Sequence, residues 1–162
     1  MRKLLLLSAL IPTLAIAEPT TQLQPMAFLA GSCWKGAFAD GQTTDEHCFD
    51  WMYEGRFLRD RHVVKAPSKP DYVGETIYYW EPEAKQIQYL YVENFGGVSR
   101  GTAEAAADGM VFPATRYSDG KMAMTYRSRW TRIDAASYEA HAEAQVKDGW
   151  ATMFRMKLTK QN

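Results

Sequence analysis

The sequence lacks a long apolar run after its first residues, and it lacks an excess of charge of either sign. The one extended apolar stretch, Leu4 to Ile16, is too short to span a bilayer as a stable helix, so no membrane span is expected. Lys and Arg together number 19, as do Asp and Glu, and the sequence contains no basic cluster. These features argue against binding to nucleic acid and against an electrostatic membrane anchor.

Motifs of common enzyme classes are also missing. The sequence has no Gly-x-Ser-x-Gly elbow, phosphate-binding loop, His-Glu-x-x-His pair or dinucleotide fingerprint. A hydrolase or a nucleotide-dependent enzyme is therefore disfavoured. We expect no catalytic residue, no metal and no cofactor, and we favour a non-enzymatic protein while leaving an enzyme open.

The first 17 residues have the features of a secretory signal peptide. Arg2 and Lys3 precede the apolar stretch, and Ala15-Ile16-Ala17 gives a small-x-small cleavage site. Cleavage after Ala17 would leave 145 of the 162 residues, with 17 basic against 19 acidic side chains, in the periplasm or outside the cell. That length fits one domain, residues 18–162, with a real hydrophobic core.

Aromatic residues are abundant, and they recur in short segments between turn signals. All 21 Phe, Trp and Tyr residues follow the expected signal peptide, and pairs such as Asp40-Gly41, Glu54-Gly55 and Asp148-Gly149 interrupt the chain. This pattern favours an all-β protein. We predict a short helix within Gln22 to Ala30 that plugs one end. The predicted strands are 32–39, 43–53, 56–65, 71–80, 86–94, 98–105, 109–116, 121–132, 137–146 and 150–159.

Alternation within these segments indicates that each strand has one buried and one solvated face. The buried face of 121–132 holds Met122, Met124, Tyr126, Ser128 and Trp130. Sequential hairpins with one apolar face close most simply into a single up-and-down antiparallel β-barrel, here of eight to ten strands.

The last hairpin illustrates how loop length fixes which faces meet. The inward residues of 138–146 match those of 150–158 if the loop consists of Lys147, Asp148 and Gly149. A two-residue loop would instead place inward residues opposite outward ones. The prediction therefore pairs Val146 with Trp150, Ala142 with Phe154 and Tyr138 with Leu158.

Two-residue turns predicted at Asp40-Gly41 and Glu54-Gly55 set the registers of the first two hairpins. Both registers agree on the buried face of 43–53. Cys33 then lies opposite Cys48 on the outer face. The predicted inward residues are Trp34, Gly36, Phe38, His47, Phe49, Trp51, Leu58, Asp60, His62 and Val64.

Two cysteines that oppose each other in an exported hairpin are most simply a disulfide. The 14 residues between Cys33 and Cys48 match neither a Cys-x-x-Cys redox motif nor a metal-ligand spacing. The bond is expected to contribute roughly 3 kcal/mol in the chain-entropy model.

His47, Asp60 and His62 form the one chemically suggestive group, because the two imidazoles would face each other across neighbouring strands. Such a group is able to bind a metal, to position a ligand head group or to act as an acid and base pair. The alternative is a set of hydrogen-bonded interior groups or of residues at a wet rim, and a register error of one residue would place them outside. His141 shares its face with Glu139 and Glu143, so we expect it on a solvated strand face.

Several motifs, in order, resemble a bacterial family of lipocalin-like (calycin) barrels of unknown function. They are Phe28-Leu29-Ala30-Gly31 followed by Cys33-Trp34-Lys35-Gly36, Tyr53 to Arg59, Tyr79 to Pro82, Phe95-Gly96-Gly97 and Asp148-Gly149-Trp150. The resemblance implies a calycin barrel with an interior cavity and no established reaction. The opening strand is also distantly similar to nitrobindin-like haem barrels, but the axial His of that family belongs to the last strand, and Trp150 to Lys160 contains no His.

We therefore expect an exported, non-enzymatic barrel that binds a small apolar or aromatic molecule. The alternatives are an enzyme or a metal- or haem-binding barrel, and a solid barrel with a structural or partner-binding role. The cluster Tyr78, Tyr79, Trp80, Tyr89 and Tyr91 is able to stack a planar ligand or to serve as barrel wall. The expected ligand-binding residues are Trp34, His47, Phe49, Trp51, Asp60, His62, Met124, Tyr126, Trp130 and Phe154.

Overall fold

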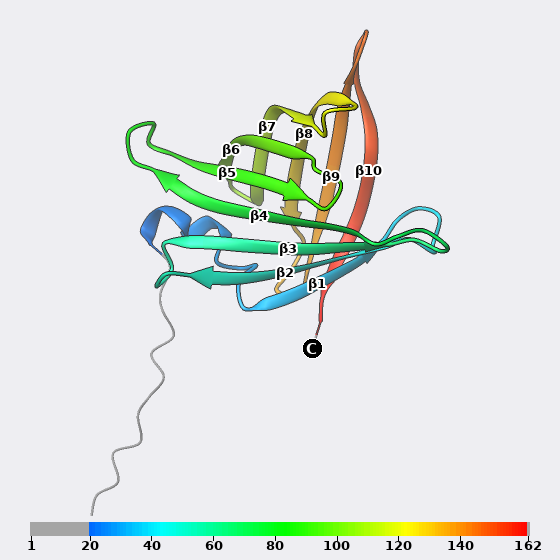
Figure 1. Cartoon of the computed structure of the whole chain (residues 1–162). Helices are drawn as coiled ribbons and strands as arrows, with labels where there is room; N and C mark the ends of the chain where they lie inside the picture. Colours follow the sequence, from blue (N-terminus) through cyan, green and yellow to red (C-terminus); the bar gives the residue numbers. More distant parts are fainter. Residues whose placement is uncertain (1–19, 162) are drawn as a thin grey trace, which may run out of the picture.

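The structure, a computed structural model, describes residues 20–161, and the expected signal peptide lies outside them. Residues 20–161 form one 3₁₀ helix and ten strands (Figure 1). Each strand begins and ends within two residues of its predicted limits. The elements are η1 (Thr21–Met26), β1 (Ser32–Ala37), β2 (Thr44–Met52), β3 (Phe57–Lys65), β4 (Tyr72–Glu81), β5 (Gln86–Glu93), β6 (Val98–Ala106), β7 (Gly109–Ser118), β8 (Ala123–Arg132), β9 (Ser137–Val146) and β10 (Gly149–Lys160).

The ten strands form a closed antiparallel barrel in which every strand pairs with its neighbours in sequence. β10 returns to pair with β1, where Gly36 lies opposite Leu158, so the sheet has no free edge. The prediction of an all-β, up-and-down barrel is confirmed. No helix among residues 20–161 has the length and apolar character needed to cross a membrane.

The predicted registers of the first two hairpins are correct, although both loops are longer than predicted. Cys33 pairs with Cys48 and His47 pairs with His62. The first loop spans residues 38–43 and the second residues 53–56, and each is centred on the two residues predicted for the turn, so the register is unchanged. In the first loop the Asp40 carboxylate accepts hydrogen bonds from the backbone N–H groups of Gln42 and Thr43. A disulfide joins Cys33 to Cys48, as predicted.

The prediction for the last hairpin is wrong near its tip. Val146 pairs with Gly149, and the register shifts between Thr152 and Phe154, where Met153 is the extra residue. Beyond this bulge the predicted pairs of Ala142 with Phe154 and of Tyr138 with Leu158 are present. On the tip side of the bulge Trp150 lies on the outer face, where the Arg127 guanidinium sits 4.3 Å from its ring centre. A β-bulge exchanges the inner and outer faces of a strand, which alternation alone does not reveal.

The predicted helix is present as η1, and it closes one end of the barrel. Leu23 and Met26 of η1 are fully buried, together with Leu29 in the turn that follows. The indole Nε1 of Trp34 donates a hydrogen bond to the Leu29 carbonyl at 3.0 Å, and this bond joins the plug to the barrel wall. The barrel core is therefore solid at this end.

Candidate functional site

A cavity of about 440 Å³ opens at the end of the barrel opposite η1. The β1–β2, β3–β4 and β7–β8 loops lie at this end. Most of the cavity wall is apolar or aromatic, and one group of polar side chains interrupts it. The lining residues are Phe38, Asp45, His47, Asp60, His62, Val64, Tyr72, Thr76, Tyr78, Tyr89, Tyr91, Phe112, Tyr117, Met122, Met124, Tyr126, Ser128, Trp130, Ala140, Ala142, Met153, Phe154 and Met156.

Seven of the ten residues expected to bind a ligand line this cavity: His47, Asp60, His62, Met124, Tyr126, Trp130 and Phe154. The other three do not. Trp34 and Phe49 are 1% and 0% exposed within the solid core, and Trp51 packs against that core. All three point inward as predicted, but they lie at the depth of the η1 plug. The alternation of apolar and polar residues predicts on which face of a strand a side chain lies, but it does not predict how deep in the barrel that side chain lies.

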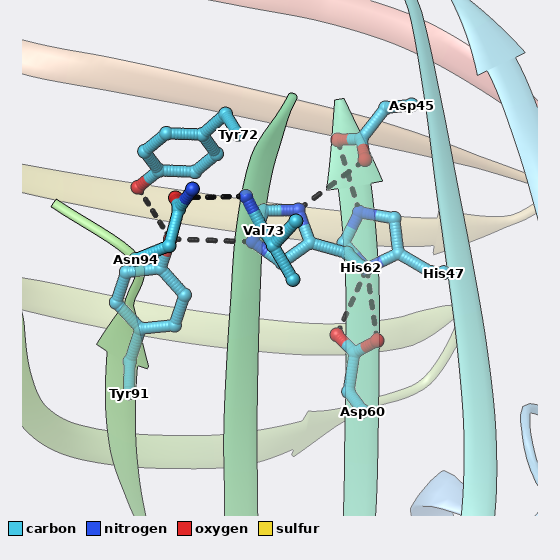
Figure 2. A network of polar contacts seen from close by, with 8 residues as sticks. All are labelled: Asp45, His47, Asp60, His62, Tyr72, Val73, Tyr91 and Asn94. Carbon is cyan, nitrogen blue, oxygen red and sulfur yellow. Dashed lines mark hydrogen bonds and ion pairs between the residues drawn. The ribbon is translucent and has the colours of Figure 1, made fainter. Parts of the chain in front are cut away.

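His47 is the centre of the polar group, and it contacts a carboxylate at each ring nitrogen (Figure 2). Its Nδ1 lies 2.8 and 3.0 Å from the two oxygens of Asp60, which faces it from β3. Its Nε2 lies 3.1 Å from Oδ2 of Asp45, which is two residues away on the same face of β2. Asp60 and Asp45 are only 2% and 4% exposed, so water contributes little to their solvation.

His62 extends the polar group toward two tyrosines. Its Nδ1 lies 3.3 Å from Oδ1 of Asp45, and its Nε2 lies 3.2 Å from the Tyr91 hydroxyl. The Tyr91 hydroxyl in turn lies 2.5 Å from the Tyr72 hydroxyl. The His62 ring also stacks on the His47 ring, with centres 4.8 Å apart and planes 18° from parallel. One continuous network thus runs from Asp60 to Tyr72 (Figure 2).

Gly74 provides the space for the His62 ring. It pairs with His62 across the β3–β4 ladder, and a Cβ at this position would lie 2.2 Å from His62 Nε2. Any side chain would therefore displace the imidazole from Tyr91.

Electrostatics within the network favour a proton on His47. Burial lowers the pKa of His47, but the carboxylates of Asp60 and Asp45 outweigh burial and raise it to about 10. Burial raises the pKa of Asp45, but the charge and hydrogen bonds of His47, together with His62, lower it well below its ordinary value. His47 and Asp45 therefore form an ion pair at neutral pH.

Sequence reasoning identified His47, Asp60 and His62 as a group, and the structure brings them together. It missed Asp45 and Tyr72, and it named Tyr91 only as an aromatic residue able to stack a planar ligand or to form barrel wall, not as a member of this polar group. Alternation was sufficient to find Asp45, which lies two residues before His47 and hence on the same face of β2. Tyr72 lies on β4 and Tyr91 on β5. Because no short turn joins β3 to β4, the sequence did not predict which residues of β4 and β5 lie beside His62.

Comparison with family models and with curated proteins gives no match for this chain.

The arrangement has two chemical capabilities. Its aromatic wall is able to surround an apolar molecule, while its hydroxyl and imidazole groups hydrogen-bond one polar end of that molecule. In addition, Asp45, His47 and His62 each offer a donor atom, and these three atoms lie within 4.8 Å of one another. His141 lies outside this site on β9, where its Nε2 contacts Thr152 at 3.1 Å and its Nδ1 contacts Arg155.

Proposed function

We propose that this protein is an exported, lipocalin-like barrel that binds one small apolar or aromatic molecule in its interior without transforming it. The observation that carries the proposal is the 440 Å³ cavity, whose wall is mostly aromatic and aliphatic with one polar group. Ligand sites of small molecules typically have volumes of roughly 300 to 1,000 Å³ and this kind of lining. The resemblance of the sequence motifs to lipocalin-like barrels supports the same conclusion.

The wall chemistry indicates how a ligand would lie. Phe112 and Trp130 are in contact, with ring centres 4.6 Å apart, and Tyr78 adds a third ring beside them. This aromatic floor would hold the apolar body of the ligand. The hydroxyls of Tyr72 and Tyr91 would hydrogen-bond its polar group, because both residues line the cavity.

Access to the cavity is consistent with an apolar ligand. Met122 and Met153 line the cavity and are 52% and 44% exposed, so they lie at its mouth. Flexible, polarizable methionine side chains adapt to varied apolar surfaces.

Export is the second part of the proposal. The signal-peptide features of residues 1–17 support it, and the Cys33–Cys48 disulfide is compatible with an oxidising compartment. Intact-mass measurement of the protein from the periplasm tests the expected cleavage after Ala17.

The binding proposal is tested by native mass spectrometry of the periplasmic protein and by titration with fluorescent fatty acids. Ala142 lines the cavity and is 4% exposed, so Ala142→Leu should reduce the space and weaken uptake at least about tenfold. Ala105 is exposed on β6 and does not line the cavity, so Ala105→Leu should bind as the wild type does. If native mass spectrometry detects only the protein without a ligand, and no fluorescent fatty acid binds, a solid barrel with a structural role is favoured instead.

A further inference from the structure

We infer that Asp45, His47 and His62 form a binding site for one divalent transition-metal ion of the zinc class in the cavity wall. The inference does not depend on the apolar ligand proposed above. It assigns a separate role to the polar group, which an apolar ligand alone would not require.

The donor atoms of the three residues lie close together. Oδ2 of Asp45 lies 3.1 Å from His47 Nε2, and Oδ1 of Asp45 lies 3.3 Å from His62 Nδ1. Ligand atoms bound tetrahedrally at 2.0 to 2.2 Å from zinc are about 3.4 Å from one another. These two distances, one to each carboxylate oxygen of Asp45, are close to this value. One donor atom from each of the three residues lies within 4.8 Å of the other two, so the side chains would move closer together on binding one ion.

The groups behind the donors have the arrangement typical of metal sites. A metal-bound imidazole usually donates its other N–H to a carboxylate or another oxygen, which fixes its tautomer and orientation. Asp60 occupies this position for His47, at 2.8 Å from Nδ1, and the Tyr91 hydroxyl occupies it for His62, at 3.2 Å from Nε2. Both tautomers then direct their remaining nitrogen toward Asp45 (Figure 2). Asp60 is thus a positioning residue and not a ligand.

The charge of the site favours a cation. Asp45 and Asp60 place two carboxylates in the cavity wall, and no Lys or Arg occurs among the residues that line it. A divalent ion with two neutral imidazoles would balance both carboxylates.

The donor types select the class of metal. Two imidazoles and one carboxylate suit Zn²⁺, Co²⁺ or Fe²⁺, whereas Mg²⁺ and Ca²⁺ prefer oxygen donors alone. Copper(I) favours thiolates, and both cysteines are engaged in the disulfide. Three protein ligands leave at least one coordination position open toward the cavity, as in zinc sites that bind water or a ligand.

The test is titration of the full mature protein with CoCl₂ and with ZnCl₂ after treatment with a chelator. One equivalent of Co²⁺ should produce visible absorption bands, and Zn²⁺ should displace it. His62→Gln and Asp45→Asn should each weaken binding at least about 100-fold, while circular dichroism verifies that both variants are folded. Asp60→Asn should weaken binding by about 10- to 100-fold, as expected for a group that orients a ligand.

His141→Gln is the matched control, because His141 lies on the outer face of β9 and should not affect binding. The inference is overturned if the wild type binds Co²⁺ no more tightly than folded His62→Gln, or if only His141→Gln loses binding. Uptake of a fluorescent fatty acid, measured with chelator present, is independent of the metal. Failure of the metal site is thereby distinguished from failure of the proposed ligand binding.

Discussion

The ion-pair network around His47 predicts a stability that decreases with rising pH above neutrality. The pKa of His47 is about 10 in the folded protein and about 6.5 in an unfolded chain. Its contribution is therefore fully present below pH 6.5, decreases between pH 6.5 and 10, and is lost above that range. Asp45 on β2 and Asp60 and His62 on β3 are the titratable groups that face it.

The magnitude follows from proton linkage. Between the two pKa values the folded protein binds one more proton than the unfolded chain, so the free energy of unfolding falls by about 1.4 kcal/mol per pH unit. Between pH 7 and pH 9 the expected loss is about 3 kcal/mol. In Asp60→Asn, His47 loses the carboxylate that raises its pKa most, so the decrease in the free energy of unfolding should end at a lower pH and be smaller than in the wild type.

The assay is urea denaturation at pH 7, 8 and 9 on chelator-treated protein, followed by tryptophan fluorescence. Asp50→Asn is the matched control, because Asp50 lies on the outer face of β2 and contacts Arg59 at 3.4 Å with both groups partly solvated. The free energy of unfolding of Asp50→Asn should decrease with pH as steeply as that of the wild type. A wild-type free energy that is flat between pH 7 and pH 9, or an Asp60→Asn slope equal to that of Asp50→Asn, would refute the reasoning.

Three further predictions concern stability. The double variant Cys33→Ser/Cys48→Ser should lose about 3 kcal/mol and melt about 6 to 12 °C lower by calorimetry, and an unchanged Tm would mean that the thiols are free in the wild type. Gly74→Ala should cost about 1 to 3 kcal/mol and shift the His62 ring resonances in NMR spectra, because its Cβ would collide with Nε2; unchanged resonances would contradict the close contact. Tyr138→Phe should be stabilising or neutral in urea denaturation, because the buried Tyr138 hydroxyl has no partner among residues 20–161; a loss above about 1 kcal/mol would indicate a missed hydrogen bond.

The fold was largely predictable because its hairpins are short and local. In the first two hairpins the turn pairs Asp40-Gly41 and Glu54-Gly55 specify the register, and the period of two then assigns every side chain to a face. The greater length of both loops did not change the registers, since the loop centres coincide with the predicted ones. Met153 shows the limit of this reasoning. Trp150 and Phe154 are both large and apolar, so nothing in their pattern reveals that a bulge separates them and reverses the face of Trp150.

The site was only partly predictable for a different reason. His47 and His62 were found because one short loop relates their strands, whereas Tyr72 and Tyr91 depend on the registers of β4 and β5. The loop from 66 to 71 contains two prolines and leaves the β3–β4 register undetermined by turn chemistry. The sequence therefore did not indicate that Gly74 lies beside His62 and leaves space for its ring.

The disulfide joins β1 to β2, the strand that carries Asp45 and His47. The pair Cys33–Cys48 is adjacent in the β1–β2 ladder to the pair Trp34–His47. Slippage of β2 against β1 by two residues would preserve the buried face of β2, but it would change which β1 residue His47 faces. The covalent bond on the outer face excludes this slippage at the residue next to His47. The bond that restricts the unfolded chain thus also fixes the register of β2, the strand that carries Asp45 and His47, against β1.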